Sequence, residues 1–234
     1  MKILFLGDSW TNGCELKDNE KYRFSTILGK KLNAEVVNIS ADGRSNHAIA
    51  RTFLEQDLSQ YDRVFVQLTN ISRTEWYDSE GKSKKVKFLE KIKFLERKNK
   101  EKQISHKYGF KKQYEKFNNV WDASWDRILV DQERYMTTGN IFEGKEWWIR
   151  YYEEIYNDEF GKSEEKMIFY LIKNRLTHLN IPHLIFSINC QCELPIDLQL
   201  NQMKYPRSNG RIAPGGHPNK IGHIMISNDI LKLL

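Results

Sequence analysis

Short apolar runs separated by polar segments mark the two ends of the chain. Four runs have the length and composition of strands covered on both faces, because β-branched or aromatic residues fill them and polar residues bound them. These runs are Lys2 to Leu6, Glu35 to Ile39, Arg63 to Leu68 and His183 to Ile188. The pattern predicts the strands of a buried parallel sheet.

Helical periodicity fills the segments between and after these runs. The predicted helices are Tyr22 to Leu32, Asn46 to Leu58, Ser163 to Asn180 and a tail after His217 with Pro218 in its first turn. The expected apolar positions are Ile168, Leu171, Ile172, Leu176 and Leu179 in the third helix and Ile221, Ile224, Met225, Ile230 and Leu231 in the tail. Alternating strands and helices are typical of a parallel α/β sheet with right-handed crossovers, so we expect the tail to cover one face.

The stretch 75–161 interrupts this alternation and is too long for an ordinary connection. Its periodicity predicts two or more amphipathic helices and no clear strand, with Phe88, Leu89, Ile92 and Leu95 on one apolar face. Five of the six tryptophans lie here, and we interpret their rings as packing the segment together, with an aromatic lid over a substrate as the alternative. We therefore predict one domain, 1–234, carrying an inserted helical, basic and aromatic-rich subdomain at 75–161.

Composition and charge narrow the class of protein. With 40% hydrophobic and 12% aromatic residues, the chain has enough apolar surface for a packed core, which excludes a disordered protein. The net charge of +6 is regional, because 82–116 holds fourteen Lys or Arg against four Glu. A solvated lysine-rich surface is the simpler interpretation of this segment, and binding of a nucleic acid is the alternative.

Targeting, membrane and cofactor signals are missing from the sequence. The apolar runs are too short to cross a bilayer, no leader precedes Lys2, and three cysteines suggest a reducing compartment, so we expect a cytoplasmic protein without a membrane partner. The histidines show no metal-ligand spacing, and no glycine-rich phosphate loop is present. We expect neither a metal nor a nucleotide cofactor; the oligomeric state is left open.

A serine and a histidine occupy positions that the predicted sheet can bring together. Gly7-Asp8-Ser9-Trp10 follows the first strand, and His217-Pro218-Asn219 opens the final helix. Because ligands of open α/β sheets bind at the carboxyl ends of the strands, Ser9 and His217 are a candidate nucleophile and base. The alternative is a turn serine and a histidine that caps a helix.

Small and amide-bearing residues follow the next two predicted strands. The segment from Asn38 to Asn46 contains Gly43, and the segment from Gln67 to Arg73 contains Asn70. Both segments lie where the N–H donors for an oxyanion would be needed. Each can equally serve as a loop and a helix cap.

Taken in order, these blocks resemble those of the SGNH hydrolase superfamily, the GDSL-like esterases and acetylhydrolases. The resemblance covers about the first seventy and the last seventy-five residues and implies a flavodoxin-like three-layer α/β/α sandwich. It implies that Ser9 is the nucleophile, that His217 is the general base, and that the N–H groups of Ser9 and Gly43 and the amide of Asn70 form the oxyanion hole. The Gly-x-Asn-Asp motif that is usual in the family is absent, so Thr69 and Ser72 are alternatives to Asn70.

The chain departs from this family at the catalytic acid. An aspartate usually stands three residues before the histidine, and Pro214 occupies that position. A backbone carbonyl holding the ring would give a Ser-His dyad; otherwise Asp8, Asp197 or an acid of the insertion would replace the aspartate. We expect a serine hydrolase acting on an ester, an O-acetyl or short acyl group on a small molecule or carbohydrate. The alternatives are a weak or inactive binding protein for a glycan, polyanion or protein, and acyl transfer to a sugar.

Overall fold

The computed structural model describes residues 1–71, 73, 75–77, 128–131, 135–138, 156–188, 192–201, 204–208 and 217–234. Its main element is a five-stranded sheet in the order β2-β1-β3-β7-β8, with every neighbouring pair parallel. The strands are β1 (Lys2–Leu6), β2 (Glu35–Asn38), β3 (Arg63–Leu68), β7 (His183–Ser187) and β8 (Leu198–Gln199). This is the flavodoxin-like order, as predicted. The two-residue strand β8 was not predicted, because it is too short to show a pattern.

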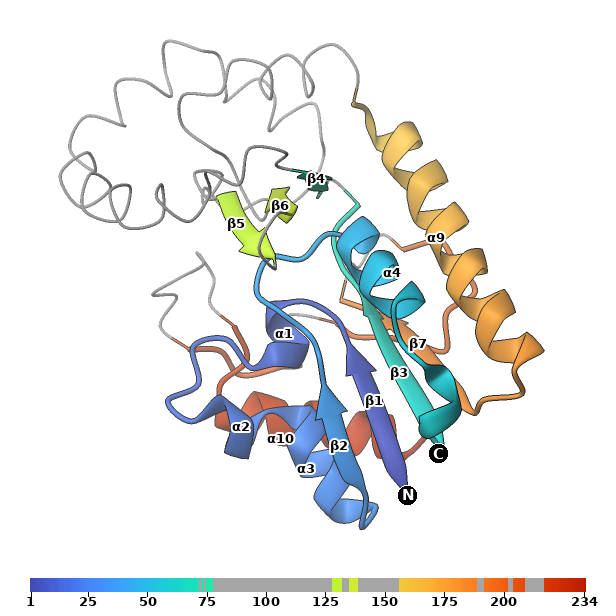
Figure 1. Ribbon diagram of the computed structural model, residues 1–234. Helices are drawn as coiled ribbons and strands as arrows, with labels where there is room; N and C mark the ends of the chain where they lie inside the picture. The colour runs from blue at the N-terminus through green and yellow to red at the C-terminus, as the bar shows by residue number, and fades with distance from the viewer. Residues whose placement is uncertain are drawn as a thin grey trace, which may run out of the picture.

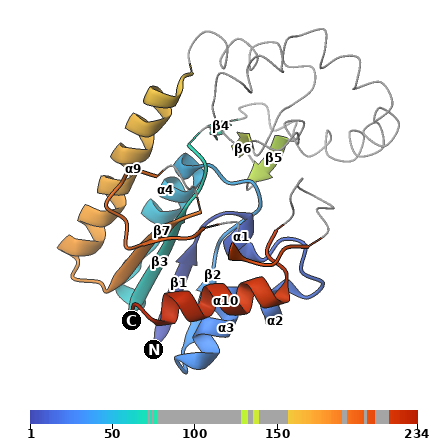
Figure 2. The same cartoon turned by 180° about the vertical axis from the view of Figure 1, so that it is seen from behind.

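Helices cover both faces of the sheet (Figures 1 and 2). On one face lie α3 (Phe24–Lys31) and α10 (Lys220–Leu231), and on the other lie α4 (Asn46–Leu54) and α9 (Asp158–His178). Three short elements complete this part of the chain: α1 (Ser9–Asn12), α2 (Asn19–Tyr22) and the 3₁₀ turn η1 (Leu58–Gln60). The three layers and the covering role of the C-terminal helix confirm the predicted sandwich.

Two apolar clusters, one on each face, hold the layers together. Because side chains alternate along a strand, β1 supplies Leu4 and Leu6 to the cluster under α4 and α9 and Ile3 and Phe5 to the cluster under α3 and α10. In the second cluster the rings of Phe5 and Phe65 stack with centroids 4.6 Å apart. Strand β1 is therefore fixed on both faces, which is what a site at its end requires.

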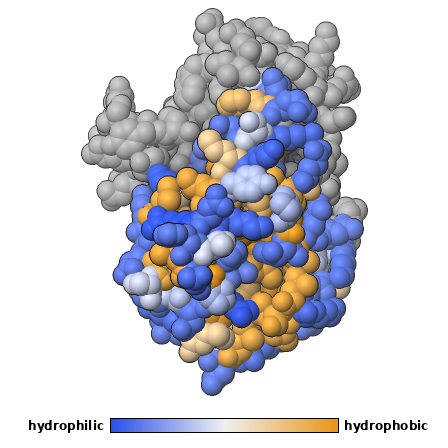
Figure 3. Space-filling model, turned by 90° about the vertical axis from the view of Figure 1, so that its right-hand side faces the viewer, coloured by the Kyte–Doolittle hydropathy of each residue, from blue (hydrophilic) through white to orange (hydrophobic). Residues whose placement is uncertain are grey.

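The buried stripe of the two long helices differs from the predicted one. In α9, Ile168, Phe169, Ile172 and Leu176 are buried, whereas Leu171 and Leu179 are 42% and 47% exposed. In α10, Ile226 and Ile230 are buried, and the predicted positions Ile221, Ile224 and Leu231 are exposed. Each helix carries apolar residues on more than one side but contacts the sheet along one stripe only. Apolar residues therefore remain on the outer surface around α9 (Figure 3).

The interrupting segment contains strands that the sequence did not predict. A three-stranded antiparallel sheet joins β4 (Glu75–Tyr77), β6 (Tyr135–Thr138) and β5 (Ile128–Asp131), in the order β4-β6-β5. The expectation of no clear strand was wrong, because strands of three or four residues offer too few positions to show alternation. The helices, the tryptophan side chains and the basic stretch 82–116 predicted in this segment lie outside the described residues.

None of the helices described here is both long and apolar enough to cross a membrane.

Candidate active site

Ser9 lies at the carboxyl end of strand β1, as the first residue of α1. The turn before it depends on Gly7, because a Cβ there would lie 2.5 Å from Thr11 Oγ1 and 2.9 Å from Gln67 Cβ. Asp8 caps α1, and Gly13 ends it in the left-handed region at φ 77°. The sequence therefore folds into a tight strand–turn–helix that holds the serine hydroxyl at the edge of the sheet.

His217 is fixed by a short two-stranded contact before the last helix. Arg207 and Pro218 form an isolated antiparallel bridge, and Ser208 N–H donates to the His217 carbonyl at 2.8 Å. Asn219 caps α10 through the N–H groups of its first turn. The sequence predicted Pro218 in the first turn of the helix. In the structure Pro218 precedes the helix, which begins at Lys220. The packing of α10 on the sheet brings this corner next to β1 (Figure 2).

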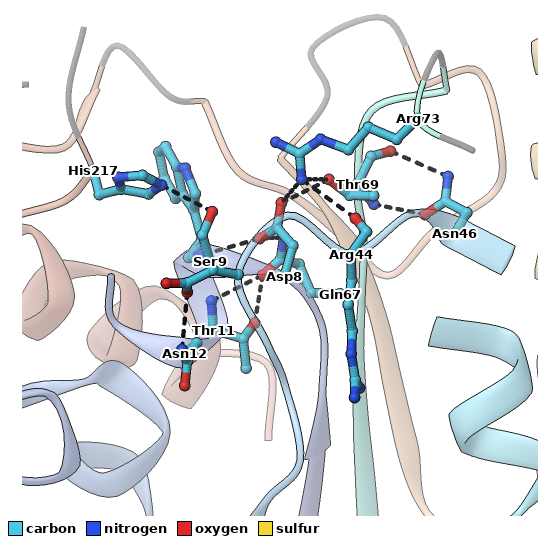
Figure 4. A network of polar contacts seen from close by, with 12 residues as sticks. Asp8, Ser9, Thr11, Asn12, Arg44, Asn46, Gln67, Thr69, Arg73 and His217 are labelled. Carbon is cyan, nitrogen blue, oxygen red and sulfur yellow. Dashed lines mark hydrogen bonds and ion pairs between the residues drawn. The ribbon is translucent and has the colours of Figure 1, made fainter. Parts of the chain in front are cut away.

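The structure brings the two predicted residues into hydrogen-bond contact. His217 Nε2 lies 2.8 Å from Ser9 Oγ, although the residues are 208 positions apart (Figure 4). Both residues are buried, with 5% of Ser9 and 6% of His217 exposed. This distance is within the range for a direct proton transfer.

Glu15 occupies the place of the acid that the sequence lacks before the histidine. Its Oε2 lies 3.3 Å from His217 Nδ1, accepts the His217 backbone N–H at 3.0 Å and accepts the Ser208 hydroxyl. The carboxylate is buried, with 3% of the side chain exposed. Glu15 also has a φ of 68°, and such backbone strain in a non-glycine residue is common at functional sites.

These contacts favour one tautomer of His217. An ionised carboxylate only accepts hydrogen bonds, so Nδ1–H points at Glu15 and the lone pair of Nε2 faces the hydroxyl of Ser9. The arrangement therefore has a nucleophile, a base and a carboxylate that orients the base. The sequence did not single out Glu15, because the resemblance directed the search to the residues before the histidine and not to the loop after Ser9.

Both acids named from the sequence as substitutes have other partners. Asp8 accepts from Trp10 N–H, Gln67, Thr69 and Arg73, and Asp197 accepts the Ile185 N–H at 2.6 Å. The contact at His217 Nδ1 is made by Glu15, and neither Asp8 nor Asp197 nor a backbone carbonyl takes that place among the described contacts. The acids of the insertion lie outside the described residues.

The predicted oxyanion donors lie in the segments that follow β1 and its two neighbouring strands, β2 and β3. Gly43 follows β2 with a φ of 74°, and Asn70 follows β3 by two residues. Ser9 N–H begins α1 and so has no acceptor within that helix. The alternative Thr69 donates its hydroxyl to Asp8 and its N–H to Asn46, and Ser72 lies outside the described residues. The three oxyanion roles remain predictions.

A second histidine lies buried behind the site. Burial, and secondarily the neighbouring His217, lowers the pKa of His223 to about 3. Its Nδ1 accepts the Phe24 N–H at 3.2 Å, so the neutral ring is a structural acceptor between α10 and α3. Within the described part of the chain, no group of three or more His, Cys, Asp or Glu residues could hold a metal ion.

No family model and no curated protein matches the chain. Solved structures that match it include a Desulfitobacterium hafniense protein ascribed to the lipolytic G-D-S-L family, at 16% identity and a TM-score of 0.37, covering 100% of this chain and 99% of that chain. A psychrotrophic esterase, EstA, from Pseudoalteromonas matches at 14% identity and a TM-score of 0.38, covering 99% of this chain and 94% of that chain. An extracellular lipase from Streptomyces rimosus matches at 10% identity and a TM-score of 0.34, covering 98% of this chain and 99% of that chain. These names agree with the family that the sequence resembles, but at such scores the likeness carries no further conclusion.

Proposed function

We propose that the protein is a serine hydrolase that cleaves an ester through Ser9, His217 and Glu15. The observation that carries this proposal is the continuous chain from Ser9 Oγ to His217 Nε2, at 2.8 Å, and from His217 Nδ1 to Glu15 Oε2, at 3.3 Å. Nucleophile, base and orienting carboxylate in this order are the parts that acyl transfer needs. All three side chains are buried, which strengthens their mutual interactions.

The proposed reaction has two halves. Ser9 Oγ attacks the ester carbonyl while His217 Nε2 takes its proton, and the imidazolium then protonates the leaving alcohol. Water attacks the acyl-enzyme with His217 again as base, which releases the acid and restores the serine. The carboxylate of Glu15 stabilises the imidazolium in both halves without itself taking the proton.

Charge on the carbonyl oxygen would be held at the carboxyl edge of the sheet. The proposed donors are the N–H groups of Ser9 and Gly43 and the side-chain amide of Asn70. Their positions after β1, β2 and β3, three neighbouring strands, support this assignment. We propose an O-acetyl or short acyl group on a small molecule or carbohydrate as the substrate, and acyl transfer to a sugar would share the first half of the reaction.

The alternative of a weak or inactive binding protein rests on the missing aspartate before His217 and on the basic, aromatic insertion. The carboxylate that Glu15 offers at Nδ1 weakens the first of these reasons.

Turnover of 4-nitrophenyl acetate by the wild type and by Ser9→Ala tests the proposal. We expect Ser9→Ala to lower kcat by at least roughly 10⁴-fold, as loss of a triad nucleophile does. Ser59→Ala is the matched control, because Ser59 lies in η1 and contacts Asp57. Equal turnover by the wild type and Ser9→Ala, or none by the wild type, would contradict the proposal and favour a binding protein.

A further inference from the structure

Arg73 lies beside the proposed nucleophile and has no role in the reaction described above. A turn after β3 positions it, in which Arg73 N–H donates to the Asn70 carbonyl at 3.2 Å. Its Nη1 donates to Asp8 Oδ2 and Thr69 Oγ1, both at 2.8 Å, and to the Arg44 carbonyl at 3.3 Å. Since Asp8 directly precedes Ser9, these bonds fix the guanidinium next to the reacting group (Figure 4).

Only one of the donor groups of Arg73 is used by these contacts. The side-chain hydrogen bonds of Arg73 all leave from Nη1, and among the described residues Nε and Nη2 have no acceptor. Nε is also buried, and a buried donor without a partner is uncommon in folded proteins. The Nε and Nη2 edge of a guanidinium is the fork that matches the two oxygens of a carboxylate.

The ion pair of Arg73 and Asp8 presents its positive end to a ligand. Asp8 has no exposed side-chain surface, whereas 15% of the Arg73 side chain is exposed. Asp8 also accepts from Gln67 at 2.6 Å and Thr69 at 2.6 Å, so its charge is shared among several donors. Arg44 is buried and donates to the Ile39 carbonyl. Arg73 is therefore the more exposed of the two arginines in this cluster.

The side of Ser9 on which Arg73 lies indicates which half of the ester it meets. Figure 4 shows His217 and Arg73 on opposite sides of Ser9. The leaving alcohol must lie on the His217 side, because His217 Nε2 gives it a proton. The acyl group then extends away from His217, towards Arg73.

We propose that Arg73 is a specificity-determining residue that binds a carboxylate on the acyl part of the substrate. This inference rests on the proposed ester hydrolysis and narrows its substrate class to esters of dicarboxylic acids, cleaved at one end while the other end stays ionised. The free carboxylate supplies the two acceptor oxygens that the unused edge of Arg73 lacks.

Two esters with one carbon skeleton test the inference. Mono-4-nitrophenyl adipate carries the carboxylate, and methyl 4-nitrophenyl adipate is its neutral counterpart. We expect the wild type to prefer the anionic ester in kcat/KM, and Arg73→Gln to reduce this preference about 10- to 100-fold, the range for a lost charge-assisted hydrogen bond. Arg73→Lys should keep an intermediate preference, because it keeps the charge and loses the fork.

Arg51→Gln is the matched control, since Arg51 lies on α4 and pairs with Glu55; it should leave the preference unchanged. An equal loss on both esters in Arg73→Gln would overturn the inference, because a purely structural or oxyanion role lowers both. So would a wild type without a preference for the anionic ester.

A binding measurement separates this inference from the proposed reaction. Calorimetry of adipate with Ser9→Ala needs no turnover, and we expect binding that is lost in the double variant of Ser9→Ala and Arg73→Gln. Binding without esterase turnover would leave the Arg73 site in place and remove the hydrolase. Turnover of the neutral ester with no adipate binding would do the reverse.

Discussion

Glu15→Gln removes the charge behind His217 and keeps an acceptor of the same shape. When the base takes the serine proton, an imidazolium forms 3.3 Å from the Glu15 carboxylate. With an effective dielectric constant of about 20, Coulomb's law gives about 5 kcal/mol for this attraction. It exists only after proton transfer has begun, so its loss raises the barrier, and a tenfold rate change corresponds to about 1.4 kcal/mol. We expect kcat to fall by about 10³- to 10⁴-fold.

Hydrolysis of 4-nitrophenyl acetate measures this effect, with thermal unfolding to verify that the variant folds. Glutamine at 15 can still accept from Ser208 and the His217 N–H, so a large loss of stability is not expected. Glu35→Gln is the matched control, because Glu35 is exposed and pairs with Lys2 at 3.7 Å. A folded Glu15→Gln variant with turnover within tenfold of the wild type would refute the assigned role of this carboxylate.

Three further substitutions test buried positions by urea unfolding. Burial raises the pKa of Glu165 from 4.5 to about 7, so the folded state loses stability as pH rises from about 4.5 to 7. Glu165→Gln should therefore raise the free energy of unfolding by up to about 3 kcal/mol at pH 8 and leave it unchanged at pH 4. A gain that is independent of pH would contradict this. The lowered pKa of His223 means that stability falls as pH drops from 6.5 towards 3, and His223→Gln should flatten that loss; an unchanged profile would argue against a buried neutral ring. Gly7→Ala should cost about 1–3 kcal/mol, because its Cβ would meet Thr11 and Gln67, and a neutral result would show that the turn can move.

The sequence predicted the sheet because its four longer strands are continuous apolar runs, each between polar segments. The same reasoning missed β8 and the small antiparallel sheet, whose strands are too short to show a period. In α9 it included Leu171 and omitted Phe169, since both are apolar and only the packing on the sheet decides which one is buried.

Ser9 and His217 could be predicted because each stands beside a recognisable boundary, the end of the first strand and the start of the last helix. Glu15 could not, because nothing in the local sequence distinguishes it from the glutamates at the surface. Its position depends on the left-handed backbone after α1 and on the 204–208 segment that closes against His217. The sequence likewise could not predict that Arg73 pairs with Asp8, because this contact forms only when β3 lies next to β1.

Mass spectrometry after treatment with a fluorophosphonate tests the central claim most directly. The reagent labels a serine only where a base has activated it. The account predicts one adduct per chain, mapped to Ser9, which disappears in His217→Ala. Labelling that persists in Ser9→Ala, or a wild type that stays unlabelled, would contradict it.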